Sequence, residues 1–434
     1  RVRQPGPVGV TASVSGPSID ERLARAALPP LPRSSWLEID EEALAGNLRL
    51  VRELVGPRVE ISAVIKADAY GHGIEAAARV FVSAGTDRLC VASLDEALHL
   101  RDVGVEAPIL VLFAIPPAAV ADAAVARVEL VAAEEGNALA LLECWRNSGL
   151  PERGTVLSIH LEAETGLARA GLAPERVGLL AQRIIATPGT RLAGLWSHLA
   201  SSNDPAASAA QVSAFDRAVR ALSDAGVPLP RRHLAATGGL FAGSAPVYDG
   251  VRPGLSLYGL IPADFPIAEQ ARAVASRLRP AMALKCRPLR IEALPADTPV
   301  GYGGVWRTAR PSLVATLPVG YGDGWSRSYS PGAAALVRGR RVPLVGSVAM
   351  DAVMADVTEL PGVGPTDEFV LLGEQGDERI TAQDLARLRN TIVWEVVTTM
   401  AQRLPRVYHS RAVLLGTRTL AGEVRVDSPS ERHS

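Results

Sequence analysis

The residue with the clearest chemical potential in this chain is Lys66. It follows the apolar run "AVI" and opens the segment "KADAYGHG", which is rich in glycine and polar rings. Lysine is rare here, since Lys66 and Lys285 are the only two among 45 Lys and Arg residues. A lysine at the end of a buried strand loses hydration, which lowers the pKa of its amine and lets it form imines with aldehydes. We therefore predict a catalytic role for Lys66.

Other unusual residues also follow short β-rich runs. They are Glu162, Glu164 and Arg169 after one run, His198 after the next, Thr237, Gly238 and Gly239 after a third, and Arg252 and Gly254 after a fourth. Taken singly, each has an ordinary explanation as a solvated charge, a satisfied histidine or a tight turn that needs positive φ. Unrelated polar residues would occur at the N-terminal and the C-terminal ends of strands alike, whereas these residues all follow the C-terminal ends. We therefore predict one shared site.

The chemistry that these residues suggest is a Schiff base between Lys66 and pyridoxal 5'-phosphate. The phosphate dianion of that cofactor needs N–H and O–H donors. The candidates are the backbone near Gly238, Gly254 and Leu255 and the hydroxyls of Tyr70 and Thr237. His198 would lie flat against the pyridine ring.

The elements that must position these residues alternate between β-rich and helical patterns. Eight strands are expected, at Glu60–Ile65, Arg88–Ala92, Pro108–Phe113, Glu129–Ala133, Thr155–Leu161, Leu192–Ser197, Arg232–Ala236 and Tyr248–Val251. Eight strand–helix units predict an α/β fold, a (β/α)8 barrel, which carries its catalytic groups at the C-terminal ends of the strands. An open doubly wound sheet would show fewer strands and a glycine-rich first turn.

A second, mostly β domain is expected after the barrel, because strands broken by Gly and Pro turns replace the alternation. One helix, near Ala382–Arg389 behind a Thr381 cap, interrupts it. The expected organisation is a disordered or loosely ordered tail at 1–34, a first strand packing on the β domain at 35–44, the barrel at 45–275, the β-rich domain at 276–422 and a tail at 423–434.

Composition excludes several classes of partner. The 45 basic and 46 acidic residues give a net charge of −1, which offers no electrostatic reason to bind nucleic acid or a membrane surface. The cysteines Cys90, Cys144 and Cys286 form neither a disulfide framework nor a metal-binding spacing, so we expect no metal and a reducing, cytoplasmic environment. No apolar run reaches membrane-spanning length.

Six motifs together resemble the bacterial alanine racemases, a family of pyridoxal-phosphate enzymes of fold type III. They are "AVIKADAYGHG", "VRPGLSLYGL", "VGYGGVW", "TLPVGYGDGW", "GSVAMD" and "RLPRVY", spread from about Trp36 to Arg411. The resemblance implies interconversion of L-alanine and D-alanine for peptidoglycan. It also implies a two-base mechanism, in which Lys66 serves one face of the substrate and Tyr302 of the partner subunit serves the other.

The resemblance assigns further roles. Arg252 would face the pyridine nitrogen and leave it unprotonated, because Arg is a donor only and stays charged. Arg169 would contact the cofactor's phenolic oxygen and the substrate carboxylate. Tyr321 would narrow the entrance, and Met350 and Asp351 would enter the substrate site from the partner subunit. The implied active unit is therefore a homodimer with shared sites.

Three positions depart from the family pattern. Glu162 stands where many members carry a carbamylated lysine, so we expect a permanent carboxylate to orient Arg169 without CO2. Thr237 replaces the usual serine of the phosphate loop, and Ala236 removes a side-chain amide. Gln402 stands where many members have a tyrosine that touches the phosphate, so we expect that contact to be weaker or absent.

Three alternative functions stay open at this point. A racemase of altered range, acting on serine or another small amino acid, has the same motifs. A decarboxylase of the same fold type would place a glutamate rather than Arg252 opposite the ring nitrogen. A non-catalytic carrier of the cofactor would be a barrel alone, without the β domain that contains Tyr302.

Overall fold

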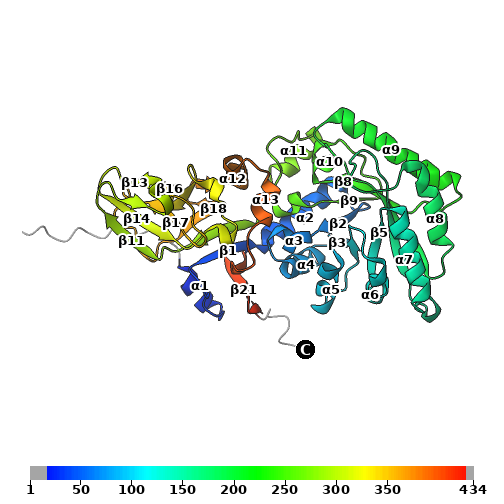
Figure 1. The fold of residues 1–434 in the computed structure, drawn as a ribbon, viewed down its shortest axis with the longest axis horizontal. Coiled ribbons are helices and arrows are strands. Elements are labelled where there is room, and N and C mark those ends of the chain that lie inside the picture. Colours follow the sequence, from blue (N-terminus) through cyan, green and yellow to red (C-terminus); the bar gives the residue numbers. More distant parts are fainter. Residues whose placement is uncertain (1–16, 427–434) are drawn as a thin grey trace, which may run out of the picture.

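The computed structural model describes residues 17–426, and the predicted tails at 1–16 and 427–434 lie outside this range. The described chain forms two domains side by side (Figure 1). A barrel built from residues of the first two thirds occupies one end, and a mostly β domain occupies the other. The predicted fold class is confirmed.

The barrel consists of eight parallel strands in sequence order, closed by pairing of the last strand with the first. The strands are β2 (Glu60–Val64), β3 (Arg88–Val91), β4 (Ile109–Val111), β5 (Val128–Ala132), β6 (Leu157–Glu162), β7 (Thr190–Trp196), β8 (Arg231–Ala236) and β9 (Gly250–Arg252). Most of their side chains are buried, because a parallel barrel is covered on both faces and its strands are therefore rich in Val, Ile, Leu and Ala. All eight strands lie where the sequence predicts them, with ends that differ by a few residues.

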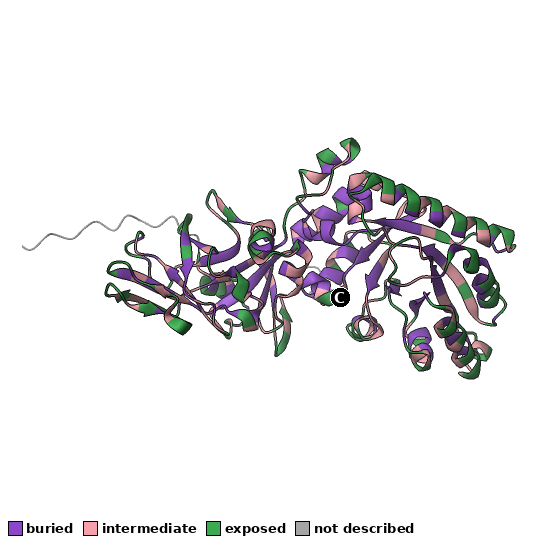
Figure 2. Cartoon of the chain, turned by 45° about the horizontal axis from the view of Figure 1, so that its top comes forward, coloured by how far each residue is buried: buried purple, intermediate pink, exposed green. Residues whose placement is uncertain are grey.

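Helices surround the barrel. They are α2 (Glu41–Val55), α4 (Ile74–Ser83), α5 (Leu94–Asp102), α6 (Val120–Val125), α7 (Glu135–Asn147), α8 (Val177–Ile185), α9 (Pro205–Asp224), α10 (Thr237–Ala242) and α11 (Glu269–Ala275). Figure 2 shows buried residues on the strands and inner helix faces and exposed residues on the outer faces. Helices begin where a side chain can cap the free backbone N–H groups or where a proline suits the first helical position. Asp40 accepts from Ala43 N, and Asp204 precedes Pro205 at the first position of α9.

The second domain is built on a 12-stranded sheet plus a separate two-stranded pair, β12 and β13. Its strands are β1 (Ser35–Asp40), β10 (Met282–Cys286), β11 (Arg290–Leu294), β12 (Pro299–Val300), β13 (Trp306–Arg307), β14 (Ser312–Leu317), β15 (Ala334–Val337), β16 (Arg340–Val345), β17 (Val353–Asp356), β18 (Phe369–Gln375), β19 (Glu378–Ile380), β20 (Arg406–Ser410), β21 (Val413–Thr419) and β22 (Gly422–Arg425). Two helices, α12 (Ala382–Arg389) and α13 (Val393–Thr398), lie between β19 and β20. The first strand, β1, pairs antiparallel with β10 and parallel with β20.

The ends of the described chain are more ordered than we expected. Within the predicted tail at 1–34, residues Ile19–Arg25 form α1, which starts with a capping box between Ser18 and Glu21. Ile19 and Leu23 are buried in a small core that includes Trp36. The prediction of a loose tail is therefore wrong for residues 17–34, because a helix this short gives little periodic signal in the sequence. Likewise β22 continues to Arg425, past the predicted boundary at 422.

Among the described residues, no helix combines the length and the apolar composition that crossing a bilayer requires.

Candidate active site

A cavity of about 490 Å³ opens at the C-terminal ends of the barrel strands. Most of the barrel residues that the sequence singled out line it, namely Lys66, Tyr70, Arg169, His198, Thr237, Gly238, Gly239, Arg252, Gly254 and Leu255, whereas Glu162 and Glu164 do not. They come from the ends of β2, β6, β7, β8 and β9 and from the loops that follow. The structure therefore brings the predicted barrel residues together in one place.

Lys66 reaches this cavity through an unusual backbone path. The four residues after it, Ala67, Asp68, Ala69 and Tyr70, have φ values of 54, 55, 53 and 54°. This left-handed turn, labelled α3 (Lys66–Tyr70), costs roughly 1–2 kcal/mol per residue for L-amino acids. Such strain persists only where surrounding contacts hold it, and it concentrates at functional sites. The turn places both Lys66 and Tyr70 in the cavity wall.

Contacts from the barrel helix α4 and from the second domain hold the strained turn. Asp68 Oδ1 accepts from the backbone N–H of Ile74 at 2.9 Å and from Arg418 Nη1 at 2.7 Å. Arg406, fully buried, donates to the carbonyl of Gly71 at 3.1 Å. A Cβ at Gly71 would lie 2.3 Å from the carbonyl oxygen of Val397, so this position has room only for glycine. Strands β20 and β21 and helix α13 therefore position the lysine.

The environment of the Lys66 amine favours its neutral form. Burial lowers its pKa, and the positive charge of Arg169 lowers the pKa further. The aromatic ring of Phe113 is close to both side chains, with its centroid 5.9 Å from Lys66 Nζ and 5.2 Å from the Arg169 guanidinium carbon. A lysine with a lowered pKa is the nucleophile that imine formation needs.

The loop at the end of β9 forms a cradle for an anion. A Cβ at Gly254 would lie 2.6 Å from Tyr70 Oη, so glycine lets the backbone approach the tyrosine hydroxyl. Thr237 Oγ1 accepts from Gly254 N at 3.1 Å and from Ser256 N at 3.3 Å, so the N–H of Gly254 is occupied within the loop. Within residues 17–426, the N–H groups of Gly238 and Leu255 have no acceptor. These two donors and the Tyr70 hydroxyl fit a phosphate group.

Arg252 is a buried residue of the cavity lining, and its guanidinium carbon lies 4.5 Å from the centroid of the Trp196 ring. Its Nη1 donates to His233 Nδ1 at 2.6 Å and to the His233 carbonyl at 2.8 Å. Its Nη2 donates to the carbonyls of Ser197 at 2.6 Å and Leu234 at 3.3 Å. Within residues 17–426 its Nε–H has neither a side-chain nor a backbone acceptor, since all its contacts involve Nη1 or Nη2. One charged donor is therefore left for a ligand, which fits an unprotonated ring nitrogen.

Glu162 lies beside Arg169, with 3.5 Å between Oε1 and Nη2. The carboxylate is buried, whereas 38% of the Arg169 side chain is exposed. Burial raises the pKa of Glu162, and the charge of Arg169 opposes that shift. The two side chains are close enough to pair, and the orienting role of Glu162 stays a prediction.

His198 is held as a neutral ring. Burial lowers its pKa to about 3, and the positive charges of Arg252, Arg169 and Lys66 contribute in the same direction. A neutral imidazole can lie against an aromatic ligand without adding a charge to a site that already holds the guanidinium groups of Arg169 and Arg252.

Family comparisons agree with this geometry. A family model described as "Alanine racemase, N-terminal domain" matches residues 39–262, and one described as "Alanine racemase, C-terminal domain" matches residues 281–408. An alanine racemase of Halothermothrix orenii is 35% identical over 387 residues, which are 88% of this chain and 98% of that protein. The chain belongs to the alanine racemase family.

Solved structures related to this family member share its fold. An alanine racemase from Bacillus anthracis with bound L-Ala-P superposes with a TM-score of 0.82 at 30% identity, covering 91% of this chain and 99% of that one. A histidine racemase from Leuconostoc mesenteroides superposes with a TM-score of 0.79 at 29% identity, covering 88% and 99%. The same architecture thus carries racemases with different amino-acid substrates.

The second-domain residues expected in an alanine racemase site do not join the cavity of their own chain. Tyr302, on the short turn Tyr302–Gly304, is 73% exposed, and Tyr321 and Met350 are also exposed. Asp351 pairs with Arg403 at 2.7 Å. None of these four predicted residues lines the barrel cavity. Gln402 is exposed and does not line it either, and the loss of its phosphate contact stays a prediction.

Sequence reasoning missed several residues of the alanine racemase cavity. Phe113, Trp196, Asn203, Trp394 and Thr398 line it. Phe113 and Trp196 lie at the C-terminal ends of predicted strands, as Lys66 does, so their positions in the sequence could have identified them as site residues. Trp394 and Thr398 lie on α13, and nothing local in the sequence indicates that a helix of the second domain reaches the barrel mouth.

Proposed function

We propose that this chain interconverts L-alanine and D-alanine with pyridoxal 5'-phosphate attached to Lys66. The observation that carries the proposal is the position of Lys66, a half-buried amine of lowered pKa that shares one cavity with a free Arg252 donor and an anion cradle. Membership of the alanine racemase family supports the same activity. The cofactor supplies an electron sink for charge that develops at the substrate Cα.

The chain's own residues would bind and orient both molecules. The N–H groups of Gly238 and Leu255 and the Tyr70 hydroxyl would hold the phosphate, with the Thr237 hydroxyl fixing the loop. Arg252 would donate its Nε–H to the ring nitrogen. Because Arg stays charged, that nitrogen would remain unprotonated, which makes the ring a weaker sink and disfavours a long-lived carbanion. This feature favours racemisation over the decarboxylase alternative, which would use a glutamate at this place.

Racemisation needs a proton donor or acceptor on each face of the substrate Cα. Lys66 would serve one face through Nζ, with Arg169 held by Glu162 to bind the substrate carboxylate. The opposite face would be served by Tyr302 of the partner subunit. The exposed position of Tyr302, outside its own cavity, supports a role across a homodimer interface. Tyr321, Met350 and Asp351 would complete the substrate entrance in the same way.

A complementation experiment tests this sharing directly. Lys66→Ala and Tyr302→Phe homodimers should each be nearly inactive. A mixed dimer of the two variants should regain turnover, because one of its sites combines an intact Lys66 with an intact Tyr302. If coexpression restores no activity although mixed dimers form, the shared site is refuted.

The activity itself is tested by following D-alanine formation from L-alanine. L-serine and L-histidine should be run in parallel, since an altered substrate range would appear as faster turnover of one of them. Purified protein that lacks a visible cofactor band and turns over none of these amino acids would refute the proposal. D-alanine made by this reaction would supply peptidoglycan in the cytoplasm, where the free thiols of Cys90, Cys144 and Cys286 would stay reduced.

A further inference from the structure

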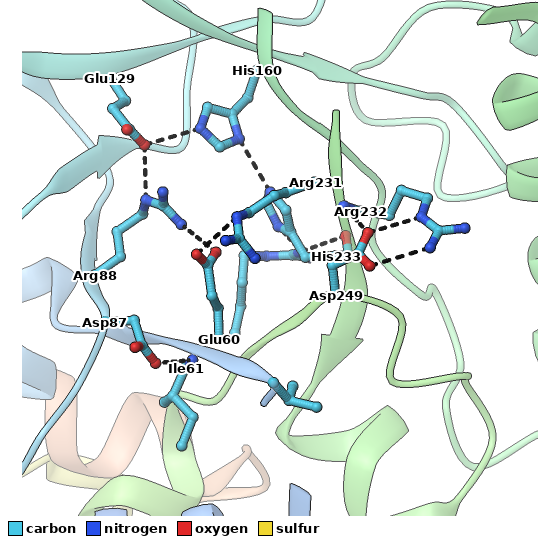
Figure 3. A network of polar contacts seen from close by, with 12 residues as sticks. Glu60, Ile61, Asp87, Arg88, Glu129, His160, Arg231, Arg232, His233 and Asp249 are labelled. Atoms are coloured by element: carbon cyan, nitrogen blue, oxygen red, sulfur yellow. Dashed lines mark hydrogen bonds and ion pairs between the residues drawn. The ribbon is translucent and has the colours of Figure 1, made fainter. Parts of the chain in front are cut away.

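A line of buried polar side chains extends from Arg252 into the barrel, away from the cavity. His233 Nε2 lies 3.2 Å from His160 Nδ1, and His160 Nε2 lies 3.0 Å from Glu129 Oε2. Figure 3 shows both contacts, with His160 between Glu129 and His233. His160 is completely buried, and Glu129 and His233 are nearly so. None of these three residues has a role in the proposed reaction.

The contacts fix the direction of every hydrogen bond in this line. Arg252 can only donate, so His233 Nδ1 must accept and a neutral His233 carries its proton on Nε2. That proton is donated to His160 Nδ1, which leaves the proton of His160 on Nε2, facing Glu129. A carboxylate can only accept. The line therefore runs one way, from a guanidinium donor to a carboxylate acceptor.

The charge states agree with this direction. Burial lowers the pKa of both His160 and His233, and the charge of Arg252 lowers that of His233 further. Burial alone would raise the pKa of Glu129, but the hydrogen bond from His160 and the charge of Arg88 outweigh it and lower the pKa to about 2. The histidines are thus neutral, and the carboxylate is ionised.

The far end of the line is anchored by Arg88, and His160 packs closely against the neighbouring strand β7. Arg88 Nε donates to Glu129 Oε2 at 2.7 Å, and Arg88 Nη1 reaches Glu60 at 3.2 Å (Figure 3). The imidazole of His160 lies against the backbone of Gly194, where a Cβ would be 2.1 Å from Nδ1. The ring position therefore depends on a glycine in the neighbouring strand.

We propose that His160 and Glu129 are positioning residues for Arg252. By fixing the tautomer of His233, they make it present a lone pair to the guanidinium. Reversal of the line would instead set an N–H of His233 against an N–H of Arg252, displacing the guanidinium from its place. The consequence for the cofactor ring rests on the proposed function, but the tautomers themselves do not.

The test measures those tautomers by ¹⁵N NMR of the full-length protein labelled at its 7 histidines, with and without cofactor. His160 and His233 should both be neutral and protonated on Nε2 in either form. A wild-type His233 that carries its proton on Nδ1, or on both nitrogens, overturns the proposal. This readout is independent of catalysis, so a failure of the proposed activity would leave it interpretable.

Two substitutions of His160 test whether the line of hydrogen bonds affects the cofactor and the reaction. His160→Leu removes the acceptor for His233, so we expect mixed His233 tautomers, a shifted visible cofactor band and kcat lower by about tenfold, as for other supporting partners of a bound group. His160→Asn restores an acceptor near the former Nδ1 and should recover the His233 tautomer and most of the activity. Equal behaviour of the two variants would contradict the proposal. If His160→Leu does not fold, the tautomers of the wild type and of His160→Asn still test the proposal.

The matched control is Glu60→Gln. It removes a carboxylate from the same buried region, one that contacts Arg88 and Arg231 but no histidine. We expect the tautomers and the visible band to stay as in the wild type. If this control shifts both of them, general disturbance of the barrel interior explains the effects and the proposal fails.

Discussion

Replacing Glu162 by Gln should weaken catalysis by a calculable amount. At 3.5 Å, unit charges attract by about 5 kcal/mol at an effective dielectric constant of ~20. With 38% of the Arg169 side chain exposed, solvent screening reduces this attraction to about 1–2 kcal/mol. The expected loss in kcat/KM is therefore about 5- to 30-fold. The isosteric amide keeps the packing while it removes the charge that orients Arg169.

The assay follows D-alanine formation at several L-alanine concentrations, in CO2-depleted and in bicarbonate buffer. Neither the wild type nor Glu162→Gln should respond to bicarbonate, whereas Glu162→Lys should gain activity from it as the carbamate forms. Glu164→Gln is the matched control, because Glu164 contacts the N–H of Gly166 and not Arg169. Unchanged kcat/KM in Glu162→Gln would refute the orienting role.

Three further predictions concern other parts of the molecule. Tyr302→Phe should abolish most turnover, which a kinetic assay of D-alanine formation checks. Because the side chain is exposed, the same substitution should change the free energy of unfolding by no more than about 0.5 kcal/mol, which urea denaturation checks. Asp68→Ala should destabilise the fold by about 3–5 kcal/mol in urea denaturation, since it leaves the fully buried Arg406 and the partly buried Arg418 without their shared carboxylate. Burial would raise the pKa of Glu38, but Lys285 and Arg22 lower it to about 2. The ionised Glu38 therefore adds about 3 kcal/mol to the free energy of unfolding above pH 4.5, and this contribution is lost as the pH falls toward 2. The stability gap between wild type and Glu38→Gln should close over that range, and a constant gap would contradict the assignment.

The barrel and the barrel half of the site follow from the sequence because both depend on local patterns. Eight apolar runs define the strands, and the polar residues that follow them, such as Lys66 and Arg252, must meet at one end of a parallel barrel. Periodicity and strand-end position are properties of neighbouring residues, so a single sequence contains them.

Other features depend on contacts between distant segments. The left-handed path of residues 67–70 is not encoded by Ala-Asp-Ala-Tyr, whose members disfavour positive φ; it is held by Arg406 and Arg418, more than 300 residues later. The inward direction of Glu129 and His160 depends on strand register, which appears only once the barrel closes.

The central claim is that Lys66 binds the cofactor, and the most direct measurement is the site of covalent attachment. Protein as purified would be reduced with borohydride, digested and analysed by mass spectrometry. The account predicts a pyridoxyl phosphate group on the peptide that contains Lys66 and none on the peptide that contains Lys285, the only other lysine. Attachment at Lys285, or full loading with cofactor and no label on Lys66, would contradict it.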